Sequence, residues 1–167
     1  DRYNTDIMEK LSVISLFSDY TNFSKLLIHN FNNIQYPKEL IEWIIVDDSK
    51  EYSGHLFPAE ENIIYIHFKP DEIKKHLEDC YKKFDVYKNE KTFENDKKEV
   101  EYNYHLKMLR LPSGFKRDYA VGISSNPYIL HLNYDCIYLQ NNIQKKINIL
   151  KKQNIDCLYS NYLITYN

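Results

Sequence analysis

Hydrophobic and polar positions along the chain alternate in blocks that predict strands and helices in turn. Short apolar runs bounded by polar residues predict strands at residues 11–17, 41–46 and 63–68. Apolar residues at helical spacing predict helices over residues 23–34 and 70–84. Strands that alternate with helices in this way are typical of a doubly wound α/β fold, a mainly parallel sheet with helices on both faces.

A charged segment interrupts this pattern in the middle of the chain. Residues 85–104 are crowded with Lys, Glu, Asp and Asn, and Val86 and Val100 are almost the only aliphatic side chains. Such a segment buries too little apolar surface to offset the entropy lost on ordering. We therefore expect a solvated or mobile excursion here, within a single domain that spans residues 1–167.

The last part of the chain predicts a return to the sheet. Helical spacing reappears over residues 105–111 and is broken at residues 112–114. Residues 116–121 are expected to lead into a central strand that starts at Tyr128 and ends at Asn133 and Asp135. A helix from about residue 143 to 150 and a further strand at residues 156–159 are expected to follow.

Composition and charge limit the class of protein. A chain of 167 residues with 43% hydrophobic residues is long and apolar enough to fold as one domain. Its net charge of -2, with mixed basic and acidic residues, gives no basic face for nucleic acid. No apolar run approaches the roughly 20 residues that a transmembrane helix needs. The first ten residues are too polar for a signal peptide, and the start at Asp1 suggests a segment of a longer protein.

The cysteines indicate a compartment rather than a site. Cys80, Cys136 and Cys157 are widely spaced and form no CxxC pair, which argues against zinc. We expect structural thiols in a reducing compartment, with Cys80 on the buried side of its helix, and hence a cytoplasmic protein.

Two of the predicted strands end in carboxylates, at Asp47 and Asp48 and at Asp135, and we expect these strands to be neighbours. The carboxyl ends of strands are where open α/β sheets bind ligands. One end could accept hydrogen bonds from a base or ribose, and the other could hold a cation that bridges diphosphate oxygens. Lys116 and Arg117 could add positive charge for the same phosphates. The simpler alternatives are turns or caps for the aspartates and a solvated helix end for the basic pair.

These motifs resemble those in the opening half of family 2 glycosyltransferases. The similarity lies in residues 11–14, 33–37 and 42–49 and in residues 116–121, which resemble the family's Lys-Arg-Asn-x-Gly-Ile segment. Residues 128–135 then fall where the family has its Asp-x-Asp strand end. The resemblance covers about residues 11 to 159 and leaves the charged excursion unmatched.

The resemblance implies a GT-A fold that binds a nucleotide-diphosphate sugar as donor across the carboxyl ends of the strands. By position in the family pattern, Asp48 would recognise the base or ribose, and Asp47 would support its loop. The turn at Phe17 and Ser18 would border the nucleotide, and Arg117 would lie near the donor.

The resemblance also implies Mn2+ or Mg2+, with Asp135 as the principal ligand and Asn133 beside it. The metal would offset the charge that develops on the departing diphosphate. Asn133 stands where the family usually has its first Asp, which removes one carboxylate, and Asp118 replaces the usual Asn. Inverting members place their catalytic base well downstream of this strand, and the stretch after Asp135 is too short for that half. We therefore assign no catalytic base.

Three hypotheses remain open. The leading one is a metal-dependent glycosyltransferase domain that acts on an unknown glycan, protein or lipid acceptor. The second is a non-catalytic GT-A-like binding or scaffold module, or the donor-binding fragment of a larger transferase, which Asn133 favours. The third is a phospho-receiver-like domain, suggested by the acidic end at Asp47 and Asp48, although the later Asp and Lys of such domains lack convincing strand contexts.

Overall fold

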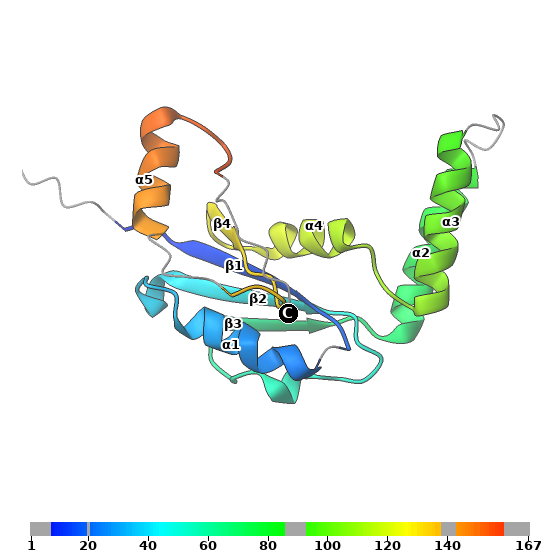
Figure 1. Ribbon diagram of the computed structural model, residues 1–167, viewed down its shortest axis with the longest axis horizontal. Helices are drawn as coiled ribbons and strands as arrows, with labels where there is room; N and C mark the ends of the chain where they lie inside the picture. The colour runs from blue at the N-terminus through cyan, green and yellow to red at the C-terminus, as the bar shows by residue number, and fades with distance from the viewer. Residues whose placement is uncertain (1–7, 20, 86–92, 138–142, 159–167) are drawn as a thin grey trace, which may run out of the picture.

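The computed structural model describes residues 8–19, 21–85, 93–137 and 143–158, and a four-stranded sheet lies at its centre (Figure 1). Its strands are β1 Leu11–Phe17, β2 Ile41–Asp47, β3 Ile63–His67 and β4 Tyr128–His131. Their order is β3-β2-β1-β4, and every neighbouring pair is parallel. Two expectations were wrong. β4 is not central but forms an edge of the described sheet, and it is not a neighbour of β2, because β1 lies between them.

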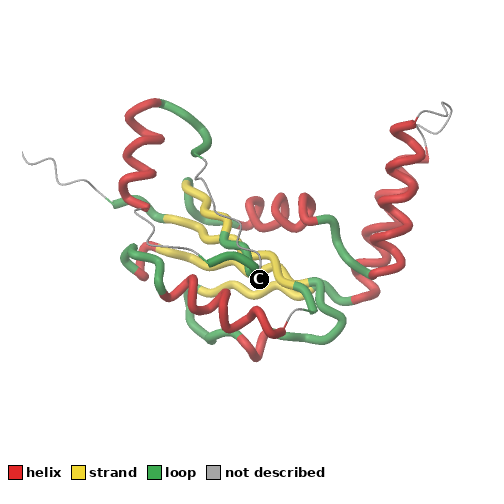
Figure 2. Tube along the Cα trace, viewed as in Figure 1, coloured by secondary structure: helices red, strands yellow, loops and turns green. Residues whose placement is uncertain are grey.

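The apolar runs of β1 and β2 are nearly continuous because both faces of the sheet are covered. On one face, Val13 and Trp43 pack against α1, Ser24–Asn32, and the ring of Phe31 stacks on Trp43 with centroids 4.1 Å apart. On the other face, Ile14 and Ile44 pack against α4, Ser113–Ile123. Helices thus lie on both sides of the sheet (Figure 2). The predicted doubly wound α/β fold is confirmed.

The remaining long helices lie towards the two ends of the molecule. Ile143 and Ile147 of α5, Ile143–Gln153, join the same core cluster as α1. α2, Pro70–Asp85, and α3, Phe93–Met108, run side by side as a hairpin that projects away from the sheet (Figure 1). None of the helices within the described ranges is long and apolar enough to cross a bilayer.

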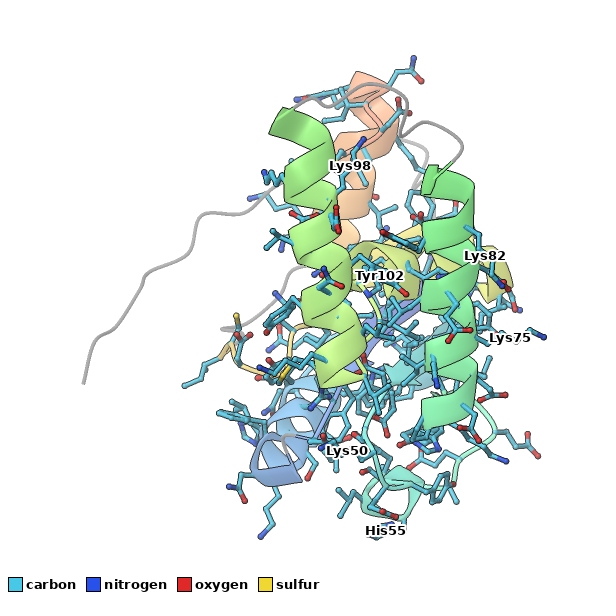
Figure 3. All side chains as sticks on the ribbon, turned by 90° about the vertical axis from the view of Figure 1, so that its right-hand side faces the viewer. Lys50, His55, Lys75, Lys82, Lys98 and Tyr102 are labelled. Atoms are coloured by element: carbon cyan, nitrogen blue, oxygen red, sulfur yellow. The ribbon has the colours of Figure 1, made fainter. Side chains whose placement is uncertain are left out.

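The helix α3 was not expected from the charged segment. Two of its described side chains hold it against the neighbouring helix α2: the ring of Tyr102 stacks on Tyr81 with centroids 4.2 Å apart, and Leu106 packs towards Ile73 and Leu77. Figure 3 shows Tyr102 between the two helices. Residues 86–92 lie outside the described part of the chain, and the mobility of the excursion stays a prediction.

Three further expectations were wrong. Residues 116–121 form part of α4 and not the approach to a strand, because Lys116 and Ala120, four residues apart, both face the sheet. Residues 156–158 form no strand: their side chains are exposed, and their backbone pairs with no strand of the described sheet. Residue 159 lies outside the described ranges. Cys80 is exposed, whereas Ile73 and Leu77 are the side chains of α2 that join the buried cluster. Like Cys80, Cys136 and Cys157 are free thiols on the surface.

Candidate functional site

The order of the strands places a crevice beside β1. β2 and β3 lie on one side of β1 and β4 lies on the other, so the direction of winding reverses between β1 and β4. Ligands in open α/β sheets bind at the carboxyl ends of the strands at such a reversal. A hollow of about 270 Å³ lies there, lined by Leu16, Ser18, Ser113, Lys116, Arg117, Asn133, Tyr134 and Asp135. Ser18, Lys116 and Asp135, which are far apart in the sequence, thus meet at one place.

Behind this hollow, Asp48 is buried among donors from three segments. Its Oδ1 accepts hydrogen bonds from the Nζ of Lys116 at 2.9 Å and from the hydroxyl of Ser18. Its Oδ2 accepts the N–H of Leu111 at 2.8 Å. Lys116 is only 5% exposed, and burial lowers its pKa although the charge of Asp48 acts in the opposite direction. The carboxylate therefore fixes the ammonium group that borders the hollow.

Asp47 lies next to Asp48 in sequence but makes hydrogen bonds to different residues. Its Oδ1 accepts the N–H of Ser49 at 2.8 Å, and its Oδ2 accepts the hydroxyl of Tyr65 from β3. Burial raises the pKa of Tyr65, and the hydrogen bond to Asp47 raises it further. Asp47 thus holds the turn after β2 against β3 and does not line the hollow.

Phe17 reaches the site only through its backbone. Its ring is buried and meets Phe57 edge to face, with centroids 5.2 Å apart. Its carbonyl accepts the N–H of Asp48 at 3.3 Å and lies 3.5 Å from the Nζ of Lys116. Only Ser18 of the predicted Phe17–Ser18 turn lines the hollow.

Arg110 is part of the same polar network, and no motif in the sequence pointed to it. Its Nη2 donates to Asp19 at 2.7 Å, and its Nη1 lies 3.4 Å from Asp48. It follows Leu109, which ends α3 in the left-handed region with φ 48°. A lone Arg in a short connection has no pattern of its own. The one available signal was that Asp19 follows the first strand as Asp48 follows the second.

The segment after β4 carries the two predicted metal ligands. Asn133 and Asp135 are both exposed and both line the hollow. Between them they offer one carboxylate and one amide oxygen, which are ligand types that hard cations prefer. In the described ranges, no group of three or more His, Cys, Asp or Glu side chains is placed to hold a metal. The donor set therefore fits a cation that takes its remaining ligands from phosphate and water, as Mg2+ commonly does.

Comparisons with known proteins test the fold. No protein-family model matches the chain, and no curated protein matches it. Among solved structures it is similar to the crystal structure of S. aureus TarS, with a TM-score of 0.53 and 12% sequence identity. The match covers 87% of this chain and 20% of the TarS chain, so the chain spans about a fifth of that protein. TarS is a GT-A-type family 2 glycosyltransferase, and the expected resemblance is thereby confirmed at the level of the fold. The chain has a glycosyltransferase-like fold of the GT-A type.

Proposed function

We propose that the chain is the donor-binding part of a metal-dependent glycosyltransferase and that it holds a nucleotide-diphosphate sugar in the hollow between β1 and β4. One observation carries this proposal. Lys116 and Arg117 from α4 line the same hollow as Asp135 from the segment after β4, at the reversal of a GT-A-like sheet. Two basic groups facing an oxygen ligand suit a diphosphate that shares a cation with the protein.

The diphosphate is assigned to the α4 side of the hollow. Arg117 can hold two phosphate oxygens through its planar fork, while Lys116 acts as a point charge fixed by Asp48. Ser113, the first residue of α4, also lines the hollow, so the N-terminus of this helix lies at the edge of the same space.

The cation, Mn2+ or Mg2+, is assigned to Asp135 and Asn133. When bound, it would supply charge to stabilise the diphosphate as the sugar is transferred. The two residues would offer it one carboxylate and one amide oxygen, and phosphate and water would supply the remaining ligands.

The nucleoside is assigned to the β1 side, near Ser18. The sequence-based role of Asp48 in recognising the base or ribose stays a prediction. Because both Asp48 oxygens already accept internal hydrogen bonds, we assign it a second role, which is to orient Ser18 and Lys116. The acceptor and the catalytic base are not assigned.

A non-catalytic binding module is the second candidate. Asn133 favours it, because a neutral amide in place of a carboxylate leaves less charge on the cation. Such a module would bind the same donor through the same residues without transferring the sugar.

The test is a thermal-shift panel of nucleoside diphosphates and nucleotide-sugars, each with Mn2+ or with EDTA. A ligand at 100 times its dissociation constant should stabilise the fold by about 2.7 kcal/mol, and only with Mn2+. Arg117→Gln should weaken binding, whereas Lys74→Gln, an exposed change on α2, should not.

Two outcomes would overturn parts of the proposal, and two others decide between the candidates. Equal stabilisation in EDTA would remove the metal from the proposal, and no stabilisation by any of these ligands would remove the donor site. Release of nucleoside diphosphate from a bound donor identifies the enzyme. Binding without release, when candidate glycan, protein and lipid acceptors are added, favours the module.

A further inference from the structure

Asn30 is a polar residue inside an apolar helix face. It is only 2% exposed and lies in α1 among Leu27 and Phe31, which pack into the core. A buried amide left without a partner would cost about 1–3 kcal/mol. Its Nδ2 donates a hydrogen bond of 2.7 Å to the carbonyl oxygen of Cys136, which is 106 residues further along the chain. This bond fastens α1 to the segment after β4.

That segment is held at alternate residues. Leu132 is buried, and its N–H donates to the carbonyl of Ile14 in β1 at 2.9 Å. The ring of Tyr134 lies against Phe23, with centroids 5.7 Å apart. Cys136 is held by Asn30, as described above. The two residues between these anchors, 133 and 135, are exposed and line the hollow.

The three anchors constrain the segment differently. The Leu132 bond continues the pairing of β4 and acts before Asp135. The ring of Tyr134 makes a tilted contact with Phe23. The Asn30 bond is directional and acts immediately after Asp135. The thiol of Cys136 also lies 3.4 Å from the Oδ1 of Asp135, so the position of Cys136 bears on the carboxylate itself.

We infer that Asn30 is a positioning residue that holds Asp135 and Asn133 at the hollow for cation binding, although Asn30 does not line the hollow itself. The inference rests on the proposed cation site. Replacing a residue that holds metal ligands in position, without binding the metal itself, typically weakens metal binding by about 10- to 100-fold.

The first measurement is a Mn2+ titration in the presence of inorganic pyrophosphate, a diphosphate without a base. Asn30→Leu keeps the approximate size of the side chain and removes the donor, and we expect about 10-fold weaker Mn2+ binding. Asp135→Asn should weaken binding further. Ile34→Val removes a core methylene near the end of α1 without touching Cys136, so it controls for lost stability and should bind Mn2+ like the wild type.

The second measurement follows the anchored segment directly. All three cysteines are exposed, so alkylation by iodoacetamide can be followed at each by peptide mass spectrometry. In Asn30→Leu, Cys136 should react several-fold faster, while Cys80 and Cys157 should react at their original rates. If Asn30→Leu does not fold, Asn30→Ser, which is too short to reach Cys136, replaces it in both measurements.

The outcomes separate this inference from the proposed function. Wild-type Mn2+ affinity in a folded Asn30 variant, or an unchanged rate at Cys136, overturns the inference and leaves the proposed site standing. A loss of affinity shared equally by Ile34→Val also overturns it, since the effect would then be one of stability alone. Absence of Mn2+ binding by the wild-type chain overturns both.

Discussion

Lys116 and Asp48 form an ion pair of 2.9 Å in which both side chains are almost completely buried. Removing two charges from water is costly, and the pair is tolerated because Ser18 and the N–H of Leu111 satisfy the same carboxylate. The pair joins α4 to the end of β2. The ammonium group at the hollow is therefore held by the core of the fold and not by a mobile surface segment.

The first prediction concerns this pair. Asp48→Asn leaves the buried charge of Lys116 uncompensated and should lower the free energy of unfolding by about 3–5 kcal/mol. Lys116→Met leaves the charge of Asp48 with only the longer contact to Arg110, and should lower it by a smaller amount. The double variant should lose clearly less than the sum of the two, because neither charge remains. Urea denaturation at pH 7 measures all three, with the exposed Lys74→Met as a control within about 0.5 kcal/mol of wild type. Additive losses would show that the two residues do not depend on each other.

The second prediction concerns pH and Tyr65. At pH 8, Tyr65→Phe should lower the free energy of unfolding by about 1.5–3 kcal/mol, because Asp47 loses a donor. The pKa of Tyr65 is raised in the folded state, so the unfolded chain releases this proton first, near pH 10. The stability that Tyr65 contributes is therefore complete below pH 10 and is lost as the pH rises above it.

Consequently, the stability gap between wild type and Tyr65→Phe should narrow above pH 10, by up to about 1.4 kcal/mol per pH unit. Urea denaturation at several pH values between 8 and 11 measures the gap. Tyr104→Phe, which changes an exposed side chain on α3, serves as the comparison and should show a constant gap. A gap for Tyr65→Phe that widens with pH would contradict the assigned bond.

The third prediction concerns the backbone at Leu109, which is left-handed with φ 48°. This conformation costs a residue with a side chain about 1–2 kcal/mol, and glycine avoids most of that cost. Leu109→Gly should therefore be more stable than Leu109→Ala by about 1 kcal/mol. At Val100, an exposed position in the middle of α3, the order should reverse, with glycine less stable than alanine by about 0.5–1 kcal/mol. Thermal unfolding of the four variants gives both differences, and the same sign at both positions would contradict the prediction.

The fourth prediction concerns Asn133. Asn133→Asp adds a carboxylate to the proposed cation site and should tighten Mn2+ binding by roughly 10-fold. Asn32→Asp adds the same charge at an exposed position on α1 and should leave the affinity unchanged. Titration of both variants with Mn2+ makes the comparison. Equal affinity in the two variants would mean that Asn133 does not touch the metal.

The fifth prediction concerns the α2–α3 hairpin. α3 leaves Val100, Tyr104 and Met108 exposed and relies on the stack of Tyr102 on Tyr81. Its amides should therefore exchange with deuterium faster than those of α1, and Tyr102→Ala should accelerate them further without changing β1. Protection of α3 equal to that of α1 would show that the charged excursion is firmly packed.

The sheet could be predicted because its strands carry a strong local signal. The strands from Leu11 and Ile41 are apolar on both faces and stop at polar turns, which is what burial between two helical layers requires. Whether two strands are neighbours has no such signal, and for this reason the partner of β4 was predicted wrongly. The wrong prediction of a strand at residues 156–158 had the same cause: an apolar run forms a strand only where another strand is available to pair with it.

The polar site was predicted in part for a similar reason. Acidic strand ends such as Asp48 and Asp135 can be located from sequence, because they interrupt an apolar run. The direction of their side chains cannot, since Asp48 turns towards Lys116 and Asp135 towards the hollow. Arg110 and Asn30 went unnoticed because each acts on a residue far away in the chain.

The pairing of β4 with β1 determines when the hollow can exist. β1 and β2 are joined by one α-helix, α1, with a short 3-10 turn on either side, and can meet while the rest of the chain is still unfolded. In the chain, β3 and the helices α2, α3 and α4 lie between β2 and β4. β4 must therefore pair with a strand that is distant in sequence, and such pairing is slow. The hollow has β1 as one wall and the end of β4 as the other. It is therefore absent from a nascent chain until β4 has docked, so the described four-stranded sheet and the hollow are completed in the same step.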